Sequence, residues 1–590
     1  MSTELRRARS RQMIIFLLVC GGMLLLLGKL YYWQAILGPT LAGWANDEHV
    51  QNQTVYAPRG SIYDAQGLLL ATNIVRDDVY VEPEQIVLDH PDTFASEREK
   101  LVQQLHAVLP NTTEENLRKA LISETPTYRI AVSIDPEQSK RLRALRLRYT
   151  FLEPRTWRNY PGGELAAQVL GYVGNSQGNG PPQGVYGLEK KYNASLTGKA
   201  GSFSAETDLN GNPLTVGAST IQDTVDGADL TLTIDSIIQY QAQAQLEDLV
   251  KKSGAKSGTV VVLNARTGAI VALAGAPTFD PNSYGNYAND KGCLGQLEVY
   301  SNPALYCAYE PGSTMKSITM AAGIDQHLIT PDTTIQDPGY HNFADGTPTV
   351  TNWDYPAGHG TETMTQVLEH SANVGASMVA HDYLGPNRFY AYLDRFGFGQ
   401  CTGLFEPEAC GTYSKSGDKG WTPSDLARQS FGQTILVTPL QVAMAYQALA
   451  NNGIQMHPYV VSSINDNGRK TRIQPKVQRQ VISAETARML TTMLMANADF
   501  NKEVSVPGYS VAMKTGTGTT QGISADQTEA SMAGYLPASN PQFVILTKLD
   551  RPHSNIFGAV TGHLWGSIAQ QLMWRYSVPP DLSFNTSNGS

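Results

Sequence analysis

The N-terminal segment constrains this chain most, because it joins a basic stretch to an uncharged apolar run. Residues 1–12 contain four arginines and one glutamate, and Met13–Gly28 is almost wholly apolar. Extended through Trp33, the run has 21 residues, close to the ~20 that cross ~30 Å of hydrocarbon as a helix. Lys29 can extend its ammonium group to the interface, where tyrosine and tryptophan are also favoured. We therefore expect a transmembrane signal anchor over residues 13–33.

The arginines also predict the orientation of this anchor. Positive residues stay in the cytoplasm, so residues 1–12 form a cytoplasmic tail and the rest of the chain is extracytoplasmic. A cleaved signal peptide is the alternative, but it requires small residues at a cleavage site after the apolar run. The bulky sequence Lys-Leu-Tyr-Tyr-Trp-Gln follows instead. No second run approaches the ~18 apolar residues of a span, so we expect a single-pass protein of the cell membrane.

Composition excludes one class of partner. The 590 residues carry a net charge of −9, and only 16% are charged. Coating a nucleic acid requires clustered lysines and arginines, so no nucleic-acid partner is expected. Outside the apolar run, four cysteines form two close pairs, Cys293/Cys307 and Cys401/Cys410. Two local disulfides fit this even count, with four free thiols as the alternative. Because no Cys/His cluster has zinc-ligand spacing, the sequence supports no metal site.

The order of strand and helix signals indicates the fold class. Alternating or continuous apolar strands occur at 230–234, 258–263 and 268–274, and again at 530–548, with a helix-rich stretch between them. This order predicts an α+β fold in which one sheet is closed by distant segments. Residues 576–590 are polar and rich in serine and asparagine, which is typical of a flexible tail.

The chemistry of the chain begins with Ser313 and Lys316. A serine and a lysine three positions apart share one face of a helix, one turn apart. A desolvated lysine can lose its proton and act as a base toward the neighbouring hydroxyl. Ser-x-x-Lys alone is weak, since Ser416 and Lys419 form a second copy in a polar stretch that is typical of a solvated loop.

Two further motifs raise the first copy above chance. Ser371-Ala-Asn373 lies 58 residues after Ser313, and Lys514-Thr-Gly-Thr517 lies 201 residues after it. In this order the three motifs resemble the signature of penicillin-binding proteins and serine β-lactamases. The surrounding sequence resembles the class B penicillin-binding proteins, monofunctional transpeptidases of cell division and elongation. The segments that carry this wider resemblance are 59–71, 160–161, 171–174, 187–198, 430–433, 438–441 and 451–453.

Two departures from the family pattern concern the local backbone. Thr434 stands where the family usually has glycine after Ser-Phe-Gly-Gln, and Thr561–Trp565 replaces a usual Ala-Ala-Pro-Val-Phe run. The resemblance implies a β-lactamase-like transpeptidase domain behind an elongated pedestal. The implied divisions are a tail over 1–12, an anchor over 13–33, a dimerisation or pedestal domain over 34–225, a transpeptidase domain over 226–575 and a tail over 576–590.

The resemblance also implies catalytic roles. Ser313 would attack the penultimate D-Ala carbonyl of a stem peptide, and Lys316 would take its proton. The backbone N–H groups of Ser313 and Thr517 would form the oxyanion hole, and Ser371 would relay the proton to the departing D-Ala amine. Asn373 would hold the peptide amide.

The Lys-Thr-Gly-Thr motif would bind substrate rather than react with it. Its four residues are Lys514, Thr515, Gly516 and Thr517, which would hold the terminal carboxylate. An amine of a neighbouring stem would then attack the acyl-enzyme and form a cross-link, and β-lactams would acylate the same serine. No cofactor is implied. A carboxypeptidase, β-lactamase or β-lactam sensor on the same fold is the alternative, and a non-enzymatic assembly scaffold is a further one.

Pedestal motifs are expected to be structural. These residues are Arg59, Gly60, Asp64, Gly187 and Glu189, among which Arg59 and Glu189 are expected to pair. Because pedestal motifs occupy residues 34–220, glycan polymerisation is assigned to a glycosyltransferase partner, with division or elongation membrane proteins as further partners.

Overall fold

A computed structural model describes residues 2–41, 50–174, 182–206, 219–501, 504–519, 528–553 and 557–582. The chain divides into two compact units, one of residues 1–57 and 198–226 and the other of residues 58–197 and 227–590. Residues 583–590 of the expected flexible tail lie outside the described residues. For residues 576–582 the expectation is wrong, because Val578 O accepts the Tyr509 hydroxyl at 2.6 Å and the Asp581 carboxylate accepts the Ser510 N–H at 2.8 Å.

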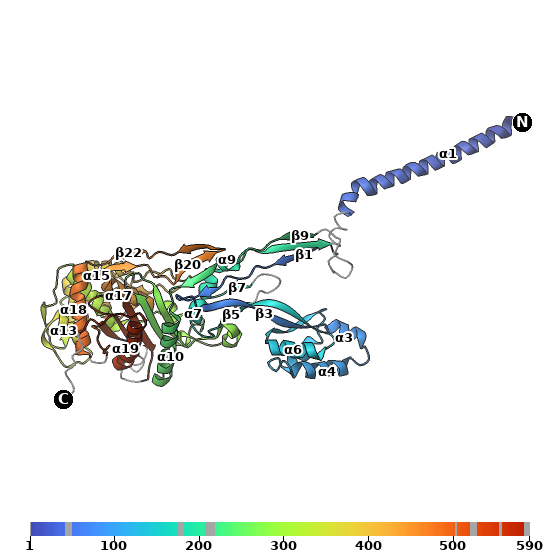
Figure 1. Ribbon diagram of the computed structural model, residues 1–590. Coiled ribbons are helices and arrows are strands. Elements are labelled where there is room, and N and C mark those ends of the chain that lie inside the picture. The colour runs from blue at the N-terminus through green and yellow to red at the C-terminus, as the bar shows by residue number, and fades with distance from the viewer. Residues whose placement is uncertain are drawn as a thin grey trace. The chain divides into compact units, whose positions relative to one another are not determined.

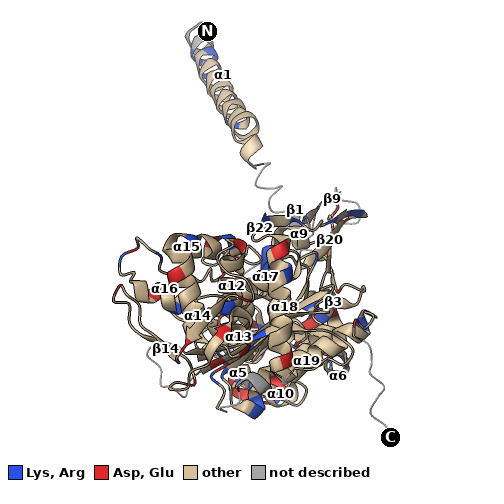
Figure 2. Cartoon of the chain, turned by 90° about the vertical axis from the view of Figure 1, so that its left-hand side faces the viewer, with Lys and Arg blue, Asp and Glu red and all other residues tan. Residues whose placement is uncertain are grey.

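The first unit contains the apolar helix. Helix α1 (Ser2–Tyr31) continues into a π-helical turn, η1 (Tyr32–Ile36), and the stretch Arg9–Ile36 is long and apolar enough to cross a membrane. Most of α1 consists of uncharged residues, drawn tan in Figure 2. The same unit contains an antiparallel sheet in the order β1-β8-β9, with bounds Val50–Val55, Gly201–Glu206 and Ser219–Gln222.

The second unit begins with the predicted hairpin between β2 (Ile62–Tyr63) and β3 (Leu69–Val81). The Asp64 carboxylate accepts N–H groups of Gln66 and Leu68 at 2.8 Å each, which fixes the turn. Strand β3 pairs with β4 (Tyr128–Ile134) and β5 (Thr150–Asn159). This ribbon carries a small helical head, which Figure 1 shows. The head has its own apolar core. Its helices are α3 (Pro83–Asp89), α4 (Phe94–His106), α5 (Glu114–Ala120) and α6 (Pro136–Leu145).

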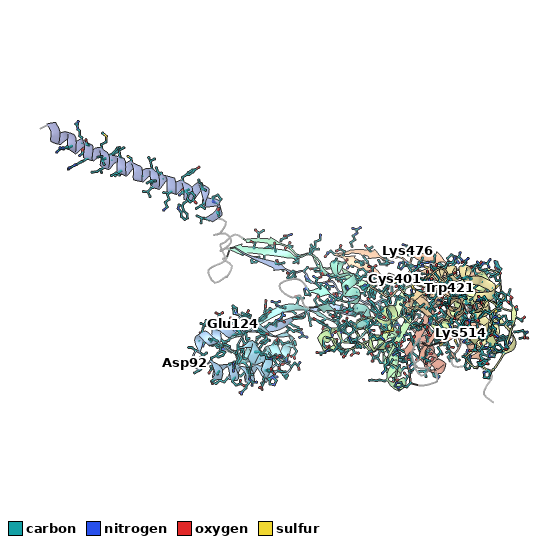
Figure 3. The ribbon with its side chains drawn as sticks, turned by 180° about the vertical axis from the view of Figure 1, so that it is seen from behind. Asp92, Glu124, Cys401, Trp421, Lys476 and Lys514 are labelled. Carbon is teal, nitrogen blue, oxygen red and sulfur yellow. A yellow bond between two sulfur atoms is a disulfide. The ribbon has the colours of Figure 1, made fainter. Side chains whose placement is uncertain are left out.

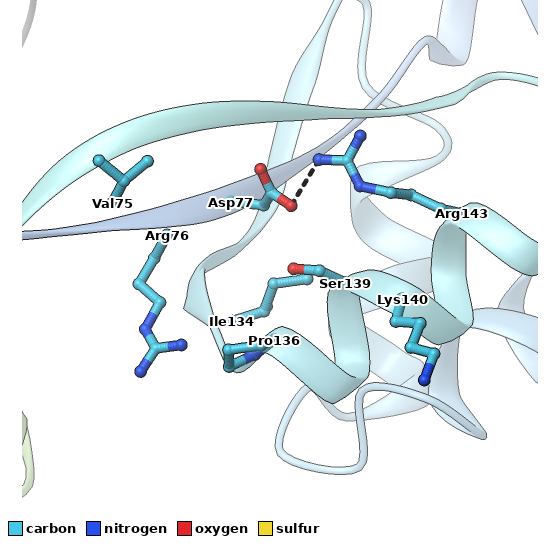
Figure 4. A pocket seen from close by; sticks show the side chains of 8 residues that line it. All are labelled: Val75, Arg76, Asp77, Ile134, Pro136, Ser139, Lys140 and Arg143. Carbon is cyan, nitrogen blue, oxygen red and sulfur yellow. Dashed lines mark hydrogen bonds and ion pairs between the residues drawn. The ribbon is translucent and has the colours of Figure 1, made fainter.

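The head bears a surface pocket of about 350 Å³ between β3 and α6. Figure 4 shows Arg143 of α6 reaching Asp77 of β3 across it, at 2.7 Å. None of its lining residues belongs to the three sequence motifs.

A buried ion cluster joins the base of this ribbon to helix α8 (Gly187–Lys191). Arg59 Nε lies 2.6 Å from Glu189 Oε2, and Arg158 Nε lies 2.7 Å from Glu189 Oε1. The expected Arg59–Glu189 pair is therefore confirmed, with Arg158 as a second partner that the sequence did not indicate.

The five-stranded sheet has the order β12-β11-β25-β24-β23 and is antiparallel throughout. Its strands are β11 (Ser257–Asn264), β12 (Ile270–Ala276), β23 (Ala512–Thr519), β24 (Thr528–Leu536) and β25 (Phe543–Asp550). The α+β prediction of one sheet built from distant segments is confirmed. Residues on the two faces of this sheet enter two different cores, and in β11, for example, successive residues alternate between them.

Helices cover both faces of this sheet. Helices α10 (Ser236–Ser253) and α19 (Phe557–Arg575) share one core with it, and α17 (Pro439–Ala450) packs on the other face. The segment Thr561–Trp565, which differs from the usual family sequence, lies inside α19. There the buried Trp565 donates its indole N–H to Ile545 O at 2.9 Å. The residues that differ from the family pattern therefore form regular helix, and the backbone there is not irregular.

The sheet that contains the β2–β3 hairpin continues across the expected boundary near residue 226. Strand β10 (Asp229–Leu232) pairs with β2 of the pedestal on one side and with β20 (Val461–Asp466) on the other. Two disulfides, Cys293–Cys307 and Cys401–Cys410, are also present, as the cysteine spacing predicted.

Candidate active site

Ser313 lies in a 3₁₀ turn, η4 (Gly312–Met315), that leads directly into helix α12 (Lys316–Asp325). The turn packs closely against β23: a Cβ atom at Gly312 would lie 2.4 Å from the Thr517 carbonyl oxygen. Gly312 also has φ +56°, so both its conformation and its neighbour require glycine. Ser313 is half-buried and Lys316 is fully buried, so a reachable hydroxyl sits one turn from a water-shielded amine.

Ser371 follows helix α13 (Met364–Glu369) in the left-handed region, at φ +56°. Non-glycine residues held there store strain that often marks a functional position. Lys316 Nζ donates hydrogen bonds to the Ser371 carbonyl oxygen and, at 3.2 Å, to Ser371 Oγ. Asn373 begins helix α14 (Asn373–Met378) and donates its side-chain N–H to Thr351 O at 3.1 Å.

The third motif occupies β23, at the edge of the five-stranded sheet. Lys514 is fully buried within the domain (Figure 3), and its Nζ donates to the Thr515 carbonyl oxygen at 3.3 Å. Thr515 is half-buried and Thr517 is exposed. Gly516 lies against the Ser313 turn, since a Cβ atom there would meet the Pro311 carbonyl oxygen at 2.6 Å. The structure therefore brings all three motifs together.

Burial controls the charge of both lysines. It lowers the pKa of Lys316 far below its usual value, and the nearby Lys514 charge lowers it further, against the opposing charges of Glu362 and Asp337. Burial alone lowers the pKa of Lys514 to about 7. Within the described ranges, neither lysine forms an ion pair. Lys316 is therefore suited to accept a proton, and Lys514 is poised to gain one when an anion binds.

The first departure, Thr434, keeps the backbone that glycine would adopt. Thr434 has φ +56°, and its N–H donates to the buried Glu310 carboxylate at 2.8 Å. Gly432, two residues earlier, accepts the Gly312 N–H through its carbonyl at 3.1 Å. The loop therefore still supports the Ser313 turn despite the β-branched residue. The second Ser-x-x-Lys copy, Ser416 and Lys419, lies in an exposed turn, as predicted.

Sequence reasoning missed a polar cluster immediately beside the second motif. Asp337, His359, Glu362 and His370 converge there, and His370 directly precedes Ser371. The only signal was the pattern His-x-x-Glu followed eight residues later by His, which contains no cysteine.

Comparison with known proteins agrees with this geometry. The family model of the penicillin-binding protein transpeptidase domain matches residues 258–573, and that of the penicillin-binding protein dimerisation domain matches residues 54–232. Stage V sporulation protein D of Bacillus subtilis is 30% identical over 588 residues, covering 97% of this chain and 86% of the relative. Peptidoglycan D,D-transpeptidase FtsI of Escherichia coli is 26% identical over 585 residues, covering 96% and 92%.

A solved structure extends the likeness to three dimensions. Penicillin-binding protein 3 of Mycobacterium tuberculosis, complexed with ampicillin, is 27% identical with a TM-score of 0.66 and covers 90% of this chain and 98% of that one. The chain belongs to the penicillin-binding proteins that carry a transpeptidase domain. Within that family it is a class B member, a serine-type D,D-transpeptidase of cell-wall synthesis rather than a hydrolase on the same fold.

Proposed function

We propose that this chain cross-links peptidoglycan stem peptides through an acyl-enzyme on Ser313. The observation that carries the proposal is the buried Lys316 amine, one turn from Ser313 and hydrogen-bonded to Ser371. Neutral Lys316 takes the Ser313 proton as Oγ attacks the penultimate D-Ala carbonyl. The tetrahedral oxyanion is held by the N–H groups of Ser313 and Thr517, each such donor typically being worth about 3 kcal/mol.

The intermediate then collapses and breaks the peptide bond. Ser371 passes a proton from Lys316 to the departing amine, so terminal D-Ala leaves and an ester on Ser313 remains. A neighbouring stem's amine attacks this ester, loses its proton to Lys316 and restores Ser313 as the alcohol. Asn373 orients the substrate amide during both steps.

Carboxylate binding is assigned to the β23 motif, Lys514 with Thr515, Gly516 and Thr517. A substrate carboxylate favours the protonated form of Lys514, whose pKa of about 7 lies close to neutrality without substrate. The exposed Thr517 and half-buried Thr515 add hydroxyl donors beside this charge.

The two copies of Ser-x-x-Lys provide the experiment. Ser313→Ala in the full-length protein is expected to abolish covalent labelling by fluorescent penicillin, while Ser416→Ala labels like the parent protein. Equal thermal unfolding of the two variants is the control for folding. Labelling that survives Ser313→Ala would assign the nucleophile to another residue.

We further infer that residues 13–33 anchor the protein, with residues 1–12 in the cytoplasm and the catalytic domain outside. The apolar helix and the arginines before it support this topology. The proposed divisions are a pedestal over 34–225 and a transpeptidase domain that begins at residue 226. The proposed partners are a glycosyltransferase that polymerises glycan and membrane proteins of division or elongation. A tagged protein is expected at midcell, whereas lateral wall patches would favour elongation.

A further inference from the structure

A compact group of imidazoles and carboxylates lies beside the second motif. Asp337 ends β13 (Thr334–Asp337), and Glu362 lies in β16 (Gly360–Thr363). His359 directly precedes β16, and His370 directly follows α13. One ligand atom each of His359, Glu362 and His370 lies within 4.8 Å of the others. Strands β13 and β16 pair antiparallel, with Asp337 opposite Gly360, and so bring Asp337 to the same place.

The spacing of these atoms is that of ligands around one small cation. His359 Nδ1 lies 3.4 Å from Asp337 Oδ2 and 3.5 Å from Glu362 Oε2, and His370 Nδ1 lies 3.0 Å from the same Glu362 oxygen. Zinc–nitrogen and zinc–oxygen bonds of about 2.0–2.2 Å in a tetrahedron place neighbouring ligand atoms roughly 3.3–3.5 Å apart. Two nitrogens and two carboxylate oxygens are a ligand set that suits zinc.

Protein groups alone leave this cluster incompletely satisfied. Asp337 and Glu362 are each 1% exposed. Among the described residues, their ion-pair partners are histidines only. Two of the inward-facing residues also carry buried atoms without a hydrogen bond, Glu362 Oε1 and His359 Nδ1. Buried carboxylates without a matching cation are costly, and a divalent ion would supply the missing charge.

An outer ring of hydrogen bonds already orients the inner groups. The second ring nitrogen of His359, Nε2, lies 3.1 Å from Asp354 Oδ2. This carboxylate–histidine arrangement typically accompanies a histidine that binds metal through its other nitrogen. Asp337 is held from the other side, because Gly339 N–H and the Asn352 side chain each donate to its carboxylate at 2.7 Å.

We propose that His359, Glu362, His370 and Asp337 bind one divalent transition-metal ion of the zinc class. With four protein ligands the site is closed, which is typical of a structural rather than a catalytic ion. The ion ties β13 and β16 to the residue that precedes Ser371, and so holds the second motif in its left-handed conformation. Only this last consequence depends on the proposed role of Ser371.

The direct test is the zinc content of the full-length protein in detergent. After chelation, one equivalent of Zn²⁺ is added, and bound metal is measured by mass spectrometry following desalting. We expect about one zinc per chain, with at least a tenfold loss in His359→Ala and in Glu362→Gln. A parent protein that retains less than a tenth of an equivalent would overturn the proposal and would leave protonated histidine–carboxylate pairs as the account of the cluster.

A neighbouring histidine provides the matched control. His381 also bridges two carboxylates, with Nδ1 2.8 Å from Asp382 and Nε2 3.0 Å from Asp345. We expect His381→Ala to keep full zinc binding, and an equal loss there would identify adventitious binding by surface histidines. Asp354→Asn, which removes only the outer carboxylate, is expected to weaken zinc affinity about 10–100-fold.

Two readouts keep the proposal independent of folding defects and of catalysis. The parent protein itself is expected to unfold at a higher temperature with Zn²⁺ than with chelator, and its Co²⁺ form to show the visible absorption of a tetrahedral site. Ser313→Ala is expected to bind zinc normally, so loss of labelling and loss of metal can be told apart. If the unfolding temperature of the parent protein is the same with Zn²⁺ and with chelator, the proposal that the ion is structural is wrong.

Discussion

Buried charges are treated in opposite ways in the pedestal and in the active site. In the pedestal, Glu189 is fully buried between two arginines, and each carboxylate oxygen has its own guanidinium partner. In the active site, Lys316 and Lys514 are equally buried, yet within the described residues neither has an ion-pair partner. The paired ions can hold only one arrangement, whereas the unpaired amines can change protonation state. The ion pairs therefore stabilise the structure of the pedestal, whereas the unpaired lysines of the active site are suited to proton transfer.

The largest expected effect comes from removing the unpaired amine that contacts Ser371. Lys316→Met keeps an unbranched side chain, one atom shorter, but removes the base, so we expect acylation by penicillin to slow about 10²–10⁴-fold. The unfolding temperature should not fall, because a costly buried amine is lost with it. Stopped-flow labelling and thermal unfolding measure the two effects, with Lys419→Met as control. A joint fall of both would mean that Lys316 serves the fold as the pedestal ions do.

The second largest effect is expected from removing the Glu189 charge, which breaks the paired ions of the pedestal. Glu189→Gln leaves two buried guanidinium groups without their anion, so we expect the free energy of unfolding to drop by about 3–5 kcal/mol. Penicillin acylation per folded molecule should remain unchanged. The exposed pair of Arg155 and Glu153, at 3.1 Å, is the matched control, and Glu153→Gln should change stability by less than about 1 kcal/mol. Equal effects at the two sites in denaturant titrations would contradict the contrast.

Titration of Lys514 gives a smaller, graded effect. Its pKa of about 7 means that the ammonium form is present below neutral pH and is lost above it. Carboxylate binding needs that charge, so the second-order acylation rate constant should fall with rising pH, approaching about tenfold per pH unit. Lys514→Arg keeps its charge and should remove this decline. A flat profile from pH 7 to 9 in the parent protein would show that the amine is not titrating there.

The smallest effect concerns the backbone beside the site. Thr434 is β-branched at φ +56°, a conformation that costs an L-residue roughly 1–2 kcal/mol. We expect Thr434→Gly to stabilise the protein by up to about 1 kcal/mol, part of the gain being offset by glycine's greater entropy when unfolded. Thr412→Gly, in the exposed strand β17 (Thr412–Tyr413), should destabilise instead. Denaturant midpoints of the two variants check the sign.

Local patterns predicted the parts of the molecule that depend on short spacings. The Ser313–Lys316 turn, the Asp64 hairpin and both disulfides follow from residues close in the sequence. Arg158 could not be found in this way, because it meets Glu189 only after β5 pairs with β3. In the imidazole–carboxylate cluster, His359, Glu362 and His370 lie close in the sequence but include no cysteine, whereas Asp337 joins them only through strand pairing.

The departures show the opposite limit of sequence reasoning. Threonine at position 434 replaces the glycine that would have indicated a left-handed backbone. The backbone is nevertheless left-handed there, and its N–H donates to Glu310. A family pattern read at one position therefore underestimated how strongly the surrounding loop determines the backbone.

The strand order of the transpeptidase sheet also determines how late in translation the sheet can form. Strand β11 begins at Ser257, but its neighbour β25 ends at Asp550 and is made almost last. The apolar edge of β11 therefore stays unpaired while nearly all of the catalytic domain is translated, and such long-range pairing closes slowly. Until then the exposed strand can pair with other chains. A chain that stops before β25 lacks the strand that joins β11 and β12 to β24 and β23.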